Sequence, residues 1–157
     1  MTHDKTIFII DGAGYYFRAY YGIRQFLSNA AGVPTNAVYG FATMLRKIIR
    51  EKSPAHLVMA LDSREKTFRH ARYNQYKANR VQMPDDLAAQ LPYIDRLIGA
   101  FNIPILKAAG WEADDLIGAV ARQGSAAGYR VVIVSSDKDL MQLVGDRVSM
   151  YDPMKEA

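Results

Sequence analysis

The sequence contains no cysteine, which excludes disulfide bonds and thiolate metal sites. Only three of its 157 residues are histidine, too few and too scattered to predict a zinc site. No apolar run approaches the roughly 20 residues of a membrane span, and the short run near the N-terminus ends directly in Asp-Gly, unlike a signal peptide. These absences favour an intracellular globular protein, in agreement with 50% hydrophobic and 23% charged residues.

Acidic and basic residues are separated along the chain. The formal net charge is only +4, yet six basic residues and one acidic residue, Glu65, lie between Arg64 and Arg80. The other acidic residues concentrate elsewhere. A chain with separate basic and acidic regions is suited to hold a polyanion with one region and a metal ion with the other.

Apolar patterns predict alternating strands and helices. Continuous apolar runs, typical of buried parallel strands, occupy residues 5–11, 55–62, 103–108, 129–137 and 147–152. Apolar residues spaced three and four apart, typical of helices, recur over 35–52, 84–102, 112–128 and 138–144. Pro92 is expected to kink or split the second of these helices. We therefore expect an α/β fold with a central, mostly parallel sheet over residues 1–157.

An aspartate ends each of the predicted strands over 5–11, 55–62 and 129–137: Asp11, Asp62 and Asp137. The carboxyl ends of parallel strands meet at one edge of a sheet, where ligands bind in open α/β folds. Asp139 lies at the following turn, and the helix over 112–128 begins at the same edge with the sequence EADD. The carboxylates expected to converge there are Asp11, Asp62, Glu112, Asp114, Asp115, Asp137 and Asp139.

So many like charges in one crevice would protonate or unfold the site unless cations neutralise them. Oxygen ligands suit hard ions such as Mg²⁺ or Mn²⁺, and the number of carboxylates suits two ions, the usual device for phosphodiester hydrolysis. The alternative for each residue alone is a helix cap, a turn residue or a partner of the helix dipole. The repetition on separate segments at one edge favours the metal site.

The stretch FRHARYNQYKANR interleaves cations with aromatic rings, a pattern that suits phosphate contact and stacking on bases. Lys77 and Arg80 are expected to orient a nucleic-acid strand at the metal site, and Arg18 is placed to reach the same crevice. The alternatives are a solvated basic loop and a surface arginine. The candidate nucleic-acid contacts are Arg18, Arg69, Arg72, Tyr76, Lys77 and Arg80.

The motifs FIIDGAGYYFRAYY, AVYGFATML, FRHARYNQYKANR, GWEADDLIGAVA and SSDKDLMQL resemble, in order and spacing, the N-terminal 5′-3′ exonuclease domain of bacterial DNA polymerase I, in the flap endonuclease family. The resemblance covers nearly the whole chain. It implies a PIN-like three-layer α/β fold with a helical arch or mobile loop over about 64–84. It also implies a two-metal nuclease that removes RNA primers and 5′ flaps during DNA replication and repair, in the bacterial cytoplasm at the nucleoid.

By this resemblance the first metal region comprises Asp11, Asp62, Glu112, Asp114 and Asp115, and the second Asp137 and Asp139. Lys77 and Arg80 form the pair that steers the scissile phosphate, with Tyr76 near the threaded strand and Arg69 as a further phosphate contact. The implied partners are DNA with a 5′ flap or a single-stranded 5′ end, RNA primer–DNA hybrids, and the remainder of a DNA polymerase I chain. The family continues with a duplex-gripping helix–hairpin–helix segment that adds aspartates to the second metal. We therefore expect either that this chain is an excised fragment or that a partner supplies the rest.

Two other functions stay open. The first is a nucleic-acid-binding fragment with an incomplete, inactive metal site, which would bind a 5′ flap without cutting it. The second is a small metal-dependent phosphatase, which shares the carboxylate cluster but has no need of six cations between Arg64 and Arg80.

Overall fold

The computed structural model describes residues 5–63, 65–73, 75, 82–153 and 155. Its centre is a five-stranded sheet with the strand order β3-β2-β1-β4-β5. The strands are β1 (Thr6–Asp11), β2 (His56–Ala60), β3 (Ile105–Leu106), β4 (Arg130–Val134) and β5 (Val148–Tyr151). Every pairing between these five strands is parallel, which confirms the predicted α/β fold class.

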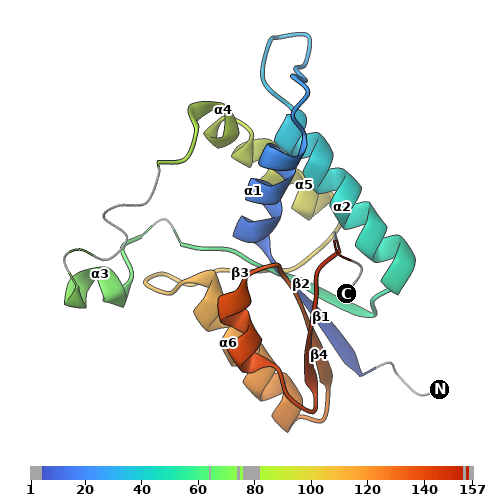
Figure 1. Cartoon of the computed structure of the whole chain (residues 1–157), viewed down its shortest axis with the longest axis vertical. Coiled ribbons are helices and arrows are strands. Elements are labelled where there is room, and N and C mark those ends of the chain that lie inside the picture. Colours follow the sequence, from blue (N-terminus) through green and yellow to red (C-terminus); the bar gives the residue numbers. More distant parts are fainter. Residues whose placement is uncertain (1–4, 64, 74, 76–81, 154, 156–157) are drawn as a thin grey trace.

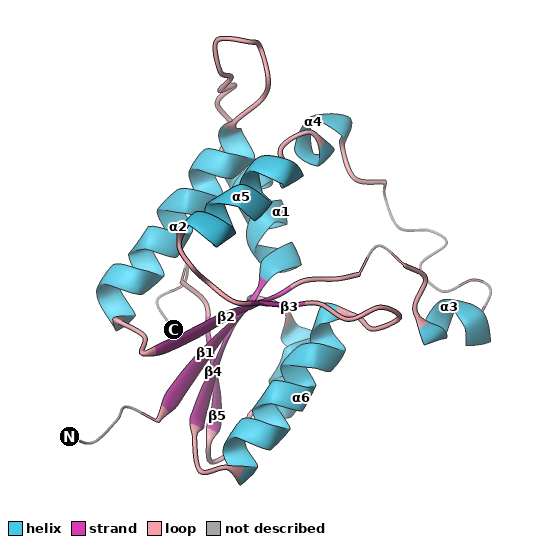
Figure 2. Ribbon diagram, turned by 180° about the vertical axis from the view of Figure 1, so that it is seen from behind, coloured by secondary structure: helices cyan, strands magenta, loops and turns pink. Residues whose placement is uncertain are grey.

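Helices cover both faces of the sheet (Figures 1 and 2). One face carries α1 (Gly12–Gly22), α2 (Asn36–Lys52) and α5 (Leu91–Ala100), and the other carries α6 (Ala113–Ala126). The alternation of side chains along β1 serves both layers, because Phe8 and Ile10 pack in one apolar core and Ile9 in the other. A strand buried on both faces reads as the continuous apolar run seen in the sequence.

The helix predicted over 84–102 is split. It forms α4 (Asp85–Ala88) and α5, and Pro92 lies in the first turn of α5, where a missing N–H breaks no helical hydrogen bond. The segment predicted as a last short helix is a 3-10 helix, η1 (Lys138–Leu143). None of the helices in the described part of the chain is both long and apolar enough to cross a bilayer.

The region predicted as an arch, about 64–84, is described in part. Residues 65–73 include the short helix α3 (Phe68–Arg72), which lies away from the sheet at the side of the molecule (Figure 1). Residues 64, 74 and 76–81 fall outside the described residues. The predicted helical arch or mobile loop therefore stays a prediction for that part.

Candidate functional site

The carboxyl ends of β1, β2 and β4 meet at one edge of the sheet, around the point where the strand order reverses. A crevice of about 410 Å³ lies at this edge, between α1 and the start of α6. The carboxylates that line it are Asp11, Asp62, Glu112, Asp114 and Asp137. Four separate segments of the chain therefore bring together five of the seven carboxylates singled out from the sequence.

Asp11, the last residue of β1, is only 6% exposed and caps the start of α1. Its Oδ1 accepts from the Gly14 N–H at 3.1 Å, and its Oδ2 accepts from the Ser135 hydroxyl at 2.9 Å. A Cβ atom on Gly14 would lie 2.6 Å from Oδ2, so only glycine permits this approach. Burial raises the pKa of Asp11; the two hydrogen bonds oppose the shift, and the charges of Asp137 and Asp62 add to it.

The start of α6 is held by carboxylates. Asp62 Oδ1 accepts from the Ala113 N–H at 2.8 Å, and the Glu112 N–H donates to Asp115 Oδ2 at 3.1 Å within a capping box. The positive end of the helix dipole favours acidic side chains here. Asp114 lies at the exposed rim of the crevice. Partial desolvation, and then repulsion from the other four crevice carboxylates, raises the pKa of Asp114 to about 6.

Asp137 follows β4 and caps η1, where its Oδ1 accepts from the Asp139 N–H at 2.9 Å. The Asp137 N–H itself donates to the Ser135 hydroxyl oxygen at 3.0 Å. Asp139 lines a second, larger groove of about 1080 Å³ beside the crevice. Asp115 lines that groove too, because neighbouring residues of a helix project in different directions. These two carboxylates therefore lie beside the crevice and are not part of its lining.

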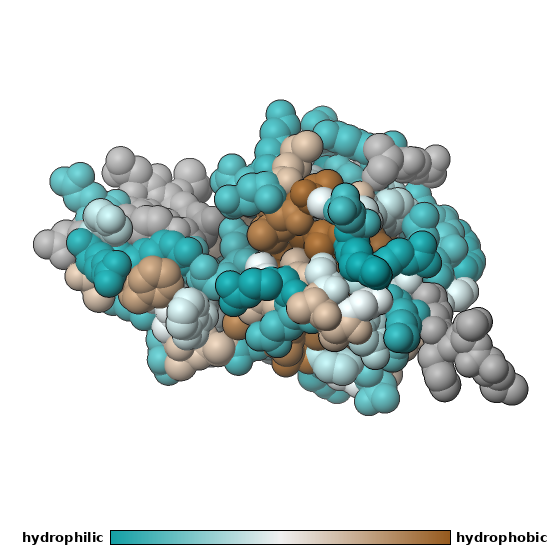
Figure 3. All heavy atoms as spheres, turned by 90° about the horizontal axis from the view of Figure 1, so that it is seen from below, coloured by the Kyte–Doolittle hydropathy of each residue, from teal (hydrophilic) through white to brown (hydrophobic). Residues whose placement is uncertain are grey.

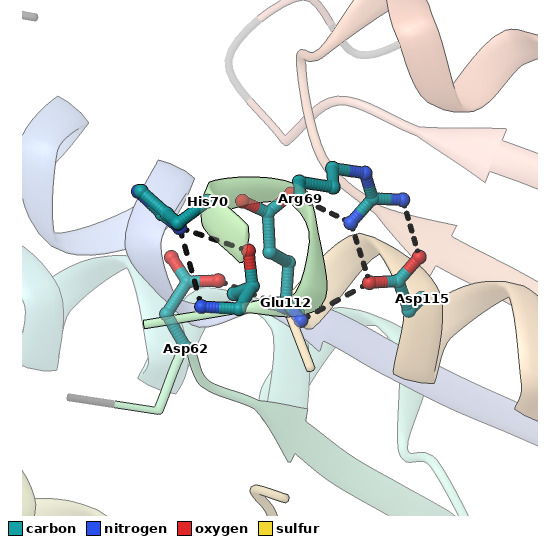
Figure 4. Close-up of polar contacts among 7 residues, drawn as sticks. Asp62, Arg69, His70, Glu112 and Asp115 are labelled. Atoms are coloured by element: carbon teal, nitrogen blue, oxygen red, sulfur yellow. Dashed lines mark hydrogen bonds and ion pairs between the residues drawn. The ribbon is translucent and has the colours of Figure 1, made fainter. Parts of the chain in front are cut away.

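Arg69 of α3 places a positive charge against the EADD turn (Figure 4). Its Nη1 and Nη2 donate to the two oxygens of Asp115 at 2.8 and 2.7 Å, and Nη1 also reaches Glu112 Oε2 at 3.1 Å. The Arg69 guanidinium lies 4.6 Å from the centre of the Phe68 ring, which meets Trp111 edge to face at 5.3 Å. The guanidinium offsets part of the repulsion at this turn, while its predicted contact with phosphate stays a prediction.

Two further candidate nucleic-acid contacts, Arg18 and Arg72, do not line the crevice. Arg18 donates to Asp152 Oδ1 at 2.6 Å, just after the end of β5. Arg72 is exposed at the end of α3, and hydrophilic residues predominate at this side of the molecule (left in Figure 3). Three of the predicted contacts lie outside the described residues: Tyr76, Lys77 and Arg80.

The chemistry of the crevice fits a hard divalent cation, because carboxylates line it and no histidine is found among the described residues of its lining. Burial and mutual repulsion disfavour the charged forms of Asp11 and Asp114, and a cation would relieve both effects. Within the described residues, however, no three acidic or histidine side chains form a group able to hold a metal ion as they stand. The donor set of the crevice suits such a cation.

Sequence analysis missed two polar residues at this edge. Ser135 directly follows β4 and bonds to Asp11, a position that only the strand register reveals. Asp152 directly follows the apolar strand β5, and Asp11 is the last residue of β1, so the pattern of an aspartate at a strand end was available in the sequence. Its partner is Arg18, and its side chain is only 11% exposed.

The family model for the 5′-3′ exonuclease N-terminal, resolvase-like domain matches residues 6–157. DNA polymerase I of Rhizobium leguminosarum is 44% identical over 163 residues, which cover 99% of this chain and 16% of that protein. A 5′-3′ exonuclease of Aquifex aeolicus is 40% identical over 152 residues, which cover 97% of this chain and 52% of that protein. The chain thus spans about half the length of the exonuclease and about a sixth of the polymerase.

Solved structures show the same fold. The T5 5′-exonuclease with bound zinc has a TM-score of 0.67 at 21% identity, covering 97% of this chain and 56% of that one. The bacteriophage T5 flap endonuclease, in a complex with DNA and metal ions, has a TM-score of 0.66 at 19% identity with the same coverage. At these identities the likeness establishes the arrangement of helices and strands.

Proposed function

The chain belongs to the family of 5′-3′ exonuclease N-terminal, resolvase-like domains, and from this premise we propose that it forms the catalytic core of a metal-dependent 5′ nuclease. The proposed reaction is hydrolysis of a phosphodiester bond in DNA, or in an RNA primer paired with DNA, near a 5′ flap or a single-stranded 5′ end. The observation that carries the proposal is the convergence of five carboxylates on one crevice. The names of the polymerase and exonuclease relatives support the substrate class, and the zinc-bound T5 structure supports metal dependence.

The carboxylates of the crevice and of the groove beside it have separate roles in this proposal. The ligands of a first Mg²⁺ or Mn²⁺ are Asp11, Asp62, Glu112 and Asp114, and those of a second are Asp137 and Asp139. Asp115 supports the first group by holding Arg69 beside Glu112. When bound, the divalent ions would activate a water molecule and neutralise charge on the scissile phosphate. The chain's own part is to orient the ligands and to hold the strand.

Basic residues hold the strand. We assign Lys77 and Arg80 to the scissile phosphate and Tyr76 to stacking on a neighbouring base, with Arg72 contacting the backbone of the strand. Binding to phosphate releases counterions from the nucleic acid, and this release favours binding less as the salt concentration rises. A phosphate contact of this kind is therefore weaker at high salt. Binding of the flap should therefore fall steeply with ionic strength and depend little on base sequence.

We propose that the chain acts as part of a longer protein. The chain spans only 52% of the Aquifex exonuclease and 16% of the Rhizobium polymerase. We assign to the remainder further ligands for the second ion and the grip on duplex DNA. A DNA polymerase I is one such remainder, and the activity then serves DNA replication and repair at the nucleoid in the bacterial cytoplasm.

A second candidate function is favoured by one observation. No group of three acidic or histidine side chains among the described residues is arranged to hold a metal ion. In this second function, the chain by itself binds branched or single-stranded nucleic acid. It does not cut the nucleic acid until the remaining part of the protein completes the metal site. A simple phosphatase is disfavoured, because the basic stretch between Arg64 and Arg80 has no use in such an enzyme.

The experiment is cleavage of a 5′-labelled flap duplex with Mn²⁺ by three proteins: the wild type, Asp114→Asn, and Asp95→Asn on the exposed side of α5. The last removes the same charge away from the crevice. The nuclease proposal predicts cutting by the wild type and Asp95→Asn, none by Asp114→Asn, and none in excess EDTA. Flap binding without any cutting would favour the binding fragment, and equal cutting by all three proteins would refute the site.

A further inference from the structure

We propose that Ser135 is a positioning residue that aligns the carboxylates of Asp11 and Asp137 for metal binding, an inference that rests on the function proposed above. Ser135 directly follows β4 and is only 5% exposed. The parallel register pairs Ile10 of β1 with Val134 of β4. The next residues, Asp11 and Ser135, therefore lie side by side at the carboxyl edge of the sheet, and a hydrogen bond joins them.

The two partners of Ser135 fix the direction of its hydroxyl group. An ionised carboxylate only accepts and a backbone amide only donates, so the hydroxyl donates to Asp11 Oδ2 at 2.9 Å and accepts from the Asp137 N–H at 3.0 Å. The bonds form a chain from the Asp137 backbone through the hydroxyl to the Asp11 carboxylate. In such a chain each bond polarises the next, so the hydroxyl is a stronger donor to the carboxylate than it would be alone.

Both ends of this chain are proposed metal ligands. At one end, the Gly14 N–H binds Asp11 Oδ1, and the bond from Ser135 to Oδ2 fixes the rotation of the carboxylate. At the other end, Ser135 holds the backbone of Asp137, whose Oδ1 also accepts from the Asp139 N–H. One buried hydroxyl therefore couples the ends of β1 and β4, which supply ligands to the two proposed ions.

Only a residue with a hydroxyl at this position does both tasks. Alanine would leave a buried carboxylate oxygen of Asp11 and the backbone N–H of Asp137 without their partner, so each ligand would keep only its other hydrogen bond and be held less firmly. Groups that orient metal ligands by hydrogen bonds are typically worth about 10–100-fold in metal affinity or activity. Threonine keeps the hydroxyl and should keep most of that affinity.

The test is the affinity of the protein for Mn²⁺ alone, measured by isothermal titration calorimetry without DNA. Ser135→Ala should bind Mn²⁺ about 10–100-fold more weakly than the wild type, and Ser135→Thr should restore most of the loss. The matched control is Ser125→Ala, because the Ser125 hydroxyl donates at 2.7 Å to the Ala121 carbonyl within α6. That control should bind Mn²⁺ as the wild type does.

A positioning role also predicts what does not change. Flap binding in EDTA should be the same for Ser135→Ala and the wild type, since the hydroxyl acts on the metal ligands and not on the strand. Wild-type Mn²⁺ affinity in Ser135→Ala would overturn the inference while leaving the nuclease proposal intact. Absence of Mn²⁺ binding by the wild type would overturn both. If Ser135→Ala does not fold, the test uses Ser135→Cys, whose thiol is a weaker donor of similar size. Mn²⁺ affinity in Ser135→Cys equal to that of the wild type would refute the positioning role.

Discussion

Replacing Asp114 by asparagine should stabilise the metal-free protein at neutral pH and abolish cleavage. The shift of the Asp114 pKa from 3.8 to about 6 corresponds to about 3 kcal/mol if the carboxylate were fully buried. Asp114 is exposed at the rim of the crevice, so solvent screening reduces this to about 1–1.5 kcal/mol. Asparagine also removes a favourable charge from the first turn of α6, a loss of about 0.5 kcal/mol. The net gain should be about 0.5–1 kcal/mol.

The gain should depend on pH. A carboxyl group with a raised pKa in the folded protein binds its proton more tightly there than in the unfolded chain. The destabilisation by Asp114 is therefore fully present above the folded pKa of about 6 and vanishes as the pH falls below the model value of 3.8. The difference in unfolding free energy between Asp114→Asn and the wild type should be largest at about pH 7.5 and shrink towards pH 4.

The assay is urea unfolding followed by circular dichroism in EDTA at several pH values, with Asp95→Asn as the control for an exposed charge. Mn²⁺ should then stabilise the wild type in proportion to its binding and stabilise Asp114→Asn much less. The reasoning is refuted if Asp114→Asn is less stable than the wild type in EDTA at pH 7.5. It is also refuted if Mn²⁺ stabilises the two proteins equally.

Three further predictions concern other residues. Gly14→Ala places a Cβ 2.6 Å from Asp11 Oδ2, so it should displace the carboxylate and weaken Mn²⁺ binding at least 10-fold by calorimetry; unchanged affinity would show that the glycine is dispensable. Arg69→Ala and Asp115→Asn should be coupled by about 1 kcal/mol in a double-mutant cycle of unfolding, because the pair is bidentate but partly exposed; additive effects would contradict the ion pair. Lys77→Ala should reduce the slope of log affinity for the flap against log salt concentration by about one, without changing the midpoint of urea unfolding. An unaltered slope would show that Lys77 does not contact the strand.

The centre of the sheet was predictable because β1 is buried on both faces. The run over 5–11 contains Phe8, Ile9 and Ile10, which supply both apolar cores, so no polar residue interrupts the pattern over 7–10. The ends of the helices were harder to predict from the sequence. The sequence left it open whether Pro92 kinks or splits a helix, and the choice depends on where the preceding turn packs, which no local pattern contains.

The carboxylate site was predictable as far as strand ends define it. Asp11, Asp62 and Asp137 share an edge because parallel strands do. Arg69 was interpreted as a phosphate contact from its neighbours in the sequence. Its bidentate pairing with Asp115 instead depends on the position of α3 beside the start of α6. Ser135 escaped notice because a single serine after a strand carries no signal until the register sets it beside Asp11.

The central claim is that the crevice at the carboxyl edge of the sheet binds catalytic divalent metal. The most direct measurement is the crystal structure of the chain soaked in Mn²⁺, with anomalous diffraction to locate the ions. We expect an anomalous peak within coordination distance of Asp11 and Asp114, with further ligands from the other crevice carboxylates. A fully loaded crystal with its anomalous peaks elsewhere, and none in this crevice, would contradict it.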